Sequence, residues 1–151
     1  MAATPQNRLS VDVKDRTFRS RAPKGQIGYA QVIANQTGIT VVTYLTGLSV
    51  TVSVGAGRAI KISCQIIHSG TVADGRSQIG IKEGVTTLQL ANFQRTSITG
   101  NTAVSSIIIT PTAGIHTYKL TQQLLDGTGT VGLAASSIAP SFILVEDIGA
   151  A

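Results

Sequence analysis

The sequence predicts an all-β protein, an antiparallel β-sandwich of jelly-roll type with an extended N-terminal arm. Three observations carry this prediction. Threonine, serine, glycine, valine and isoleucine dominate the 151 residues, and only 13% are charged, about half the ~25% typical of soluble domains. Short stretches alternate between apolar and polar residues, and clusters of turn-forming residues separate them. The length suits one domain with an appendage.

The clearest alternation surrounds the sequence Gly55-Ala56-Gly57. Successive side chains on a strand point to opposite faces, so each flanking stretch reads as a half-buried strand. We interpret the two stretches as an antiparallel hairpin around a glycine turn. The residues expected to face inward are Leu48, Val50, Val52, Val54, Ile60, Ile62, Cys64 and Ile66.

The rest of residues 26–151 shows the same pattern of short alternating strands separated by turns. Ile79 and Ile81, followed by Leu88 and Leu90, flank Glu83-Gly84 and predict a second hairpin. The stretch from Phe142 to Val145 is apolar on both faces, so its strand should be central in a sheet. No stretch predicts a helix. The expected strands are residues 27–34, 39–45, 48–54, 59–67, 75–83, 86–95, 103–110, 115–124, 129–137 and 141–146.

The charge is concentrated at the N-terminus. Residues 1–25 contain six basic and two acidic residues, a net charge of +4, which leaves +1 for the remaining 126 residues. We therefore divide the chain into an extended basic arm, residues 1–25, and a jelly-roll trimerisation domain, residues 26–151. A disordered basic tail is the alternative, but Leu9, Val11 and Val13 alternate with polar residues like a short strand that could add to a partner's sheet. The residues expected to bind are Arg8, Leu9, Val11, Val13, Lys14, Arg16, Phe18, Arg19, Arg21 and Lys24.

Sequence patterns that could indicate a catalytic, metal or cofactor site are better explained by structural roles. Residues 127–132 match G-x-G-x-x-G, but the dinucleotide motif needs a helix there, and Pro140 follows closely. His68 and His116 lack metal-ligand spacing, and Cys64 is the only cysteine. The acidic residues of the body show no pairing suited to hydrolysis. We expect no enzyme, no catalytic residue, no metal and no cofactor.

Two further partner classes are also not expected. The six aromatic residues of the chain are not interleaved with basic ones, as nucleic-acid binding would favour. No run of 18 apolar residues occurs, so no membrane-spanning helix is predicted.

Several segments resemble a known domain. Residues 113–120 (AGIHTYKL), 126–130 (DGTGT) and 140–149 (PSFILVEDIG) are similar to a domain recurrent in tailed phages of actinobacteria. Residues 28–30 and 46–52 fit the same pattern, and the likeness extends over about residues 26–149. The closing string is its most specific part. That domain resembles the trimeric tumour necrosis factor-like jelly roll and occurs in capsid decoration proteins and minor tail proteins.

The resemblance implies a virion structural protein made in the bacterial host cytoplasm. We expect a capsid decoration, or cement, protein on the outer capsid surface, whose arm binds the major capsid protein. The alternative is a minor tail or receptor-binding protein that contacts a host surface glycan. In both cases we expect a homotrimer, with Tyr29, Tyr118, Phe142 and Leu144 at its interface.

Overall fold

The computed structural model describes residues 23–95 and 99–151, and every regular element in that part of the chain is a strand. No helix there is long and apolar enough to cross a membrane. The strands are β1 (Gly25–Val32), β2 (Gln36–Ile39), β3 (Thr43–Val54), β4 (Arg58–Gly70), β5 (Arg76–Glu83), β6 (Thr86–Gln94), β7 (Thr99–Ile109), β8 (Gly114–Leu124), β9 (Val131–Leu133) and β10 (Ser141–Ala150).

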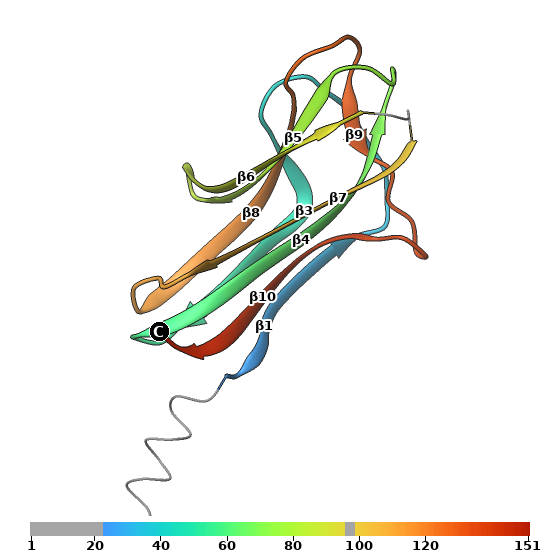
Figure 1. Cartoon of the computed structure of the whole chain (residues 1–151). Coiled ribbons are helices and arrows are strands. Elements are labelled where there is room, and N and C mark those ends of the chain that lie inside the picture. The colour runs from blue at the N-terminus through green and yellow to red at the C-terminus, as the bar shows by residue number, and fades with distance from the viewer. Residues whose placement is uncertain (1–22, 96–98) are drawn as a thin grey trace, which may run out of the picture.

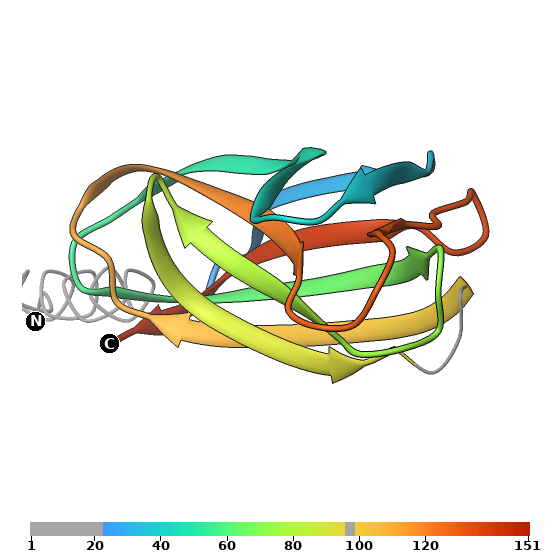
Figure 2. The same ribbon diagram turned by 90° about the horizontal axis from the view of Figure 1, so that it is seen from above.

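Two antiparallel sheets pack face to face (Figure 1). One has the strand order β3-β8-β5-β6. The other is built on the long strand β4, which pairs with β10 and β9 and, along its other edge, with β7. Strand β1 extends this second sheet beyond β10, and β2 pairs with β9. Figure 2 shows β1, β10, β4 and β7 side by side in one layer. The predicted antiparallel jelly-roll sandwich is confirmed.

The predicted hairpin around Gly55-Ala56-Gly57 is wrong in its pairing, although both strands exist. Strand β3 pairs with β8, and β4 lies in the opposite sheet, so the turn crosses from one sheet to the other. The alternation predicted the buried set correctly, from Leu48 to Val54 and from Ile60 to Ile66. An apolar face looks the same in sequence whether two strands share a sheet or face each other across the core.

The second predicted hairpin is confirmed, since β5 pairs with β6 around Glu83-Gly84. The apolar strand near the C-terminus is also central, as predicted, because β10 lies between β1 and β4. Two predicted strands, 39–45 and 48–54, overlap one long strand, β3, whose pairing with β8 shifts register between Tyr44 and Ser49. Gly47 lies in that shift with a φ of 80°, a backbone conformation that glycine adopts readily.

The core fills the space between the sheets. Val50, Val52, Tyr118 and Leu120 of one sheet belong to the same buried cluster as the isoleucines of β4 and β10 in the other. Close packing extends to the backbone at Gly28 on β1. A Cβ atom at Gly28 would lie only 2.6 Å from Cγ1 of Val52, so the absent side chain lets β1 approach β3.

Candidate interaction surfaces

The layer of β1, β10, β4 and β7 packs one face against the core and exposes the opposite face to solvent. Along β10, Ile143 and Val145 point into the core, while Phe142 and Leu144 alternate with them and point outward. Register brings outward residues of the four strands together in rows, such as Phe142 beside Gln65 and Leu144 beside Ser63. We call this surface the β10 face. It consists of Tyr29, Gln31, Lys61, Ser63, Gln65, Val104, Ser106, Ile108, Phe142, Leu144 and Glu146.

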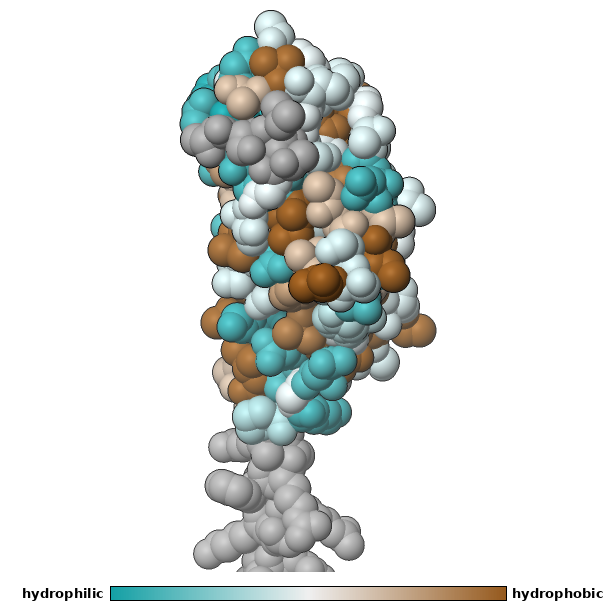
Figure 3. Space-filling model, turned by 90° about the vertical axis from the view of Figure 1, so that its right-hand side faces the viewer, coloured by the Kyte–Doolittle hydropathy of each residue, from teal (hydrophilic) through white to brown (hydrophobic). Residues whose placement is uncertain are grey.

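The β10 face exposes several large apolar side chains to solvent. Val104 is 67% exposed, Ile108 62% and Tyr29 44%. The rings of Tyr29 and Phe142 lie 6.0 Å apart, centre to centre. In Figure 3, which views the molecule from the side of this layer, hydrophobic side chains lie among polar ones. Apolar patches bordered by polar residues mark contact sites between proteins.

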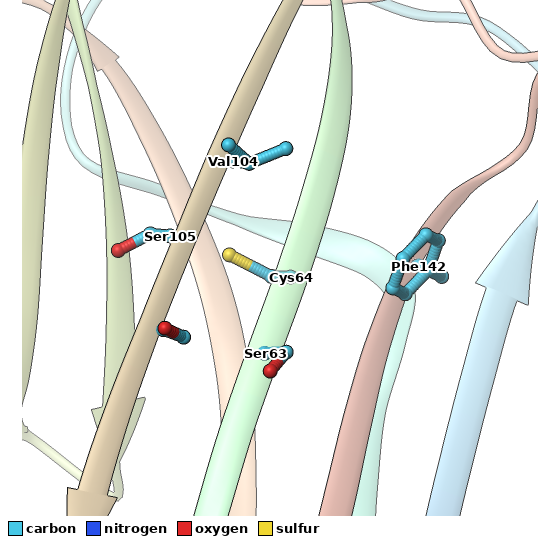
Figure 4. Close-up of a pocket in the computed structure, with 6 residues that line it drawn as sticks. Ser63, Cys64, Val104, Ser105 and Phe142 are labelled. Atoms are coloured by element: carbon cyan, nitrogen blue, oxygen red, sulfur yellow. The ribbon is translucent and has the colours of Figure 1, made fainter.

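A shallow hollow of about 430 Å³ lies across this face. Figure 4 shows the Phe142 ring on β10 and Val104 on β7, on either side of Ser63 and Cys64 on β4. Ser63 and Ser106, which pair across β4 and β7, are small enough to leave a depression between the larger side chains. The face therefore carries exposed apolar side chains and, between Val104 and Phe142, a depression large enough to receive a side chain.

Three of the four residues predicted for a trimer interface share the β10 face: Tyr29, Phe142 and Leu144. Tyr118 does not. Its side chain is fully buried between the sheets, in phase with Leu120 on β8. Its prediction as an interface residue is therefore wrong in placement, because a core side chain cannot contact a neighbouring copy. Val104 and Ile108, which the prediction did not include, also lie on the β10 face, because β7, like β10, has apolar residues on both of its faces.

Cys64 lies at the hollow, but its thiol is expected to be unreactive. Its side chain is buried, and burial raises the pKa of the thiol to about 11. The nucleophilic thiolate is therefore scarce at neutral pH. The prediction of a buried Cys64 is confirmed.

The arm leaves the body beside the end of β10. The backbone N–H of Lys24 donates to the carbonyl of Asp147 at 3.1 Å. Asp147 is buried, and Nε of Arg58 donates to its Oδ2 at 3.0 Å. Burial alone would raise the pKa of Asp147, but the Arg58 guanidinium and the Gly149 N–H hold it below its ordinary value. This point of attachment is thus fixed by a buried ion pair. The other arm residues predicted to bind, from Arg8 to Arg21, lie outside the described residues.

A second hollow, of about 180 Å³, lies on the outward face of the β3-β8-β5-β6 sheet. Two residues that line it, Leu90 on β6 and Thr121 on β8, pair with Gly80 on β5 from either side. We call it the Gly80 hollow. Amide, hydroxyl, amine and aliphatic groups line it, from Val42, Gln78, Lys82, Thr87, Leu90, Thr121 and Gln123. The sequence pattern does not indicate this set, because its members come from three strands, β5, β6 and β8, and from Val42 just before β3.

The two histidines are both used within the fold. His116 has a ring nitrogen 2.6 Å from Oε1 of Glu83 and the other 2.9 Å from the carbonyl of Thr112. His68 is fully buried, its Nδ1 accepts a hydrogen bond from Gln122, and burial lowers its pKa to about 4. No group of three potential metal-ligating side chains occurs within residues 23–95 and 99–151. Where a dinucleotide motif would need a helix, strand β9 begins at Val131.

Comparison with known proteins addresses the fold. No protein-family model matches the sequence, and no curated protein is similar to it. Among solved structures, murine APRIL aligns over 82% of this chain and 99% of its own, with a TM-score of 0.53 and 10% identity. At that identity the likeness shows the fold alone.

Carbohydrate-binding modules also align, less closely. A CBM36 module in complex with calcium and xylotriose covers 78% of this chain and 98% of its own, with 19% identity and a TM-score of 0.43. The CBM6cm-2 module of Cellvibrio mixtus lichenase 5A, in complex with cellotriose, covers 81% and 98%, with 13% identity and a TM-score of 0.43. These overlaps are too low to carry a functional argument. The fold of this chain is similar to the tumour necrosis factor-like jelly roll.

Proposed function

We propose that this protein is a bacteriophage virion structural protein, a homotrimeric capsid decoration protein on the outer surface of the shell. The observation that supports self-assembly is the β10 face. Val104, Ile108 and Tyr29 leave much apolar area in water, and covering apolar surface contributes about 25 cal/mol per Å². Exposed apolar side chains and a hollow on one face suit a cyclic assembly, in which each copy contacts the next through different parts of that face.

Attachment to the shell is assigned to the arm. Its net charge of +4 becomes +12 in a trimer, which would steer it towards an acidic surface. Exposed ion pairs are individually worth only about 0–1 kcal/mol, so no single arginine should decide binding. Three linked arms act together, and avidity raises affinity by about 10²–10⁴-fold.

The test is binding of the purified full chain and of a chain lacking residues 1–22 to undecorated shells across a salt series. The truncation leaves β1 and its contact with Asp147 in place. We expect the full chain to bind and the truncated chain to lose binding. Charge reversal at Arg16, Arg19 and Arg21 together should weaken binding most at low salt, because salt screens exposed charges. Equal binding of truncated and full-length protein would show that the arm is not the anchor.

A second candidate function is a minor tail or receptor-binding protein that contacts a host glycan. The Gly80 hollow favours it, because amide and hydroxyl side chains surround aliphatic walls there. The two functions differ in where the trimers lie on the virion, at the shell or at the tail tip, which electron microscopy of labelled particles distinguishes.

The proposal includes no catalytic step and no bound metal. Both ring nitrogens of His116 are engaged by Glu83 and Thr112, and His68 is enclosed in the core. Elemental analysis of the purified protein tests this part: stoichiometric metal that disappears with either histidine would contradict it.

A further inference from the structure

We propose that the Gly80 hollow binds a single acidic sugar residue, a hexuronate, with its carboxylate at Lys82. The inference deepens the second candidate function and rests on it only for the class of ligand. It concerns binding by the protein in solution, so it can fail or succeed independently of where the protein lies on the virion.

The absence of a side chain at Gly80 lets two of the residues that line the hollow, Thr121 and Leu90, lie close to its backbone. A Cβ atom there would lie 2.6 Å from Oγ1 of Thr121 and 3.1 Å from Cδ2 of Leu90, so a larger residue would displace these two side chains and change the wall of the hollow. The space of about 180 Å³ corresponds to roughly six water molecules at ~30 Å³ each. That size suits one monosaccharide unit rather than a chain of them.

A ladder of amides holds one rim of the hollow in place. Nε2 of Gln123 donates to Oε1 of Gln78 at 2.9 Å, and Nε2 of Gln78 donates to Oδ1 of Asn92 at 2.7 Å. These bonds fix the amide orientations before a ligand arrives. Among the described residues, Oε1 of Gln123, which lines the hollow, has no hydrogen-bond partner, so an acceptor remains available to sugar hydroxyls.

Charge on this face is unbalanced. Lys82 lies directly opposite Lys119 on the neighbouring strand, an arrangement of like charges that destabilises a sheet. Lys119 places its Nζ over the Tyr44 ring, 5.4 Å from the centroid. Lys82 lines the hollow and has no acidic partner within the described residues. The acid next to it, Glu83, points the other way and contacts His116.

These groups together select the ligand. The aliphatic side chains of Val42 and Leu90 can cover the C–H face of a sugar ring, and the amides and Thr121 can bond its hydroxyls. The ammonium of Lys82 then favours a sugar that carries a carboxylate over its neutral counterpart.

The experiment is NMR titration of the ¹⁵N-labelled full chain with glucuronate, with glucose as the neutral analogue and inorganic phosphate as a bare anion. We expect saturable shifts of the backbone amides of Gln78, Thr121 and Gln123 with glucuronate, with a Kd on the order of 1 mM, as suits a ligand of this size. Glucose should bind at least about tenfold more weakly.

Two variants decide the role of the lysine. Lys82→Gln should weaken glucuronate binding about tenfold, while its affinity for glucose stays unchanged. The matched control is Lys61→Gln, which removes a lysine from the β10 face and should leave glucuronate binding as in the unaltered protein. The proposal is overturned if glucuronate and glucose bind equally, if shifts occur outside the hollow, if phosphate alone binds as tightly as glucuronate, or if Lys82→Gln has no effect.

Discussion

Nδ1 of His116 lies 2.6 Å from Oε1 of Glu83, while the other ring nitrogen faces the carbonyl of Thr112. Both neighbours are acceptors, so only the doubly protonated ring can donate to both. The hydrogen bond to Glu83 raises the pKa of His116 above its ordinary value of 6.5 and outweighs the opposing effect of burial. The stabilisation is therefore complete below about pH 6.5 and is lost as pH rises through the higher folded-state pKa.

We accordingly expect His116→Ala to cost about 1.5–3 kcal/mol at pH 5.5, the value of a hydrogen bond to a charged group. The cost should be clearly smaller at pH 9. Urea unfolding at the two pH values measures the difference, with His68→Ala as a comparison, whose cost should not fall in this way. A cost for His116→Ala that is independent of pH would contradict the protonated assignment.

Two arginine–aspartate ion pairs near the loops 71–75 and 126–130 should contribute differently to the free energy of unfolding. The side chain of Arg95 is fully buried, and it donates to Asp74 at 2.8 Å and to the carbonyls of Val72 and Thr128. Arg76 and Asp126 are 55% and 44% exposed, and exposed pairs contribute little.

Arg95→Met should therefore lower the free energy of unfolding by about 1.5–3 kcal/mol, because several hydrogen bonds from one buried, charged donor are lost. Arg76→Met should leave the urea midpoint nearly unchanged. If the two variants unfold at the same urea concentration, the claim that Arg95 stabilises the fold more than Arg76 is wrong.

Gly28 should not tolerate even one added carbon. A Cβ atom there would lie 2.6 Å from Cγ1 of Val52, and overpacking of a core costs about 1–3 kcal/mol. At Gly55 the nearest atom to a built Cβ is 3.6 Å away, so Gly55→Ala is the matched control. Thermal unfolding should show a lower Tm for Gly28→Ala only, and equal Tm values would refute the packing argument.

The sequence was informative about which residues are buried and less so about which strands are neighbours. The alternation of Val50 and Val52 with hydroxyl residues follows directly from the two-residue period of a strand. The same period gives no information on the pairing of β3, because an apolar face can meet either a neighbour's face or the opposite sheet. Pairing is decided by contacts between residues far apart in the chain.

The candidate surfaces likewise contain residues that the sequence pattern predicts and residues that only strand pairing brings together. Phe142 and Leu144 were predictable from a strand that is apolar on both faces. Tyr118 could have been assigned to the core, since it shares its phase with Leu120. The Gly80 hollow could not be predicted, because Leu90 and Thr121 reach Gly80 only through strand pairing.

The most direct test of the account is the mass of the full chain in solution by light scattering, together with two leucine variants. The chain has a mass of 15.6 kDa, so a trimer, three times that, has 46.8 kDa. We expect the trimer mass for the unaltered protein and for Leu90→Glu, which changes an exposed leucine on the other sheet. Leu144→Glu should reduce the mass to that of a monomer, because a carboxylate buried without a partner in the β10 face is costly. A monomeric unaltered protein, or a Leu144→Glu variant that remains trimeric, would contradict assembly through this face.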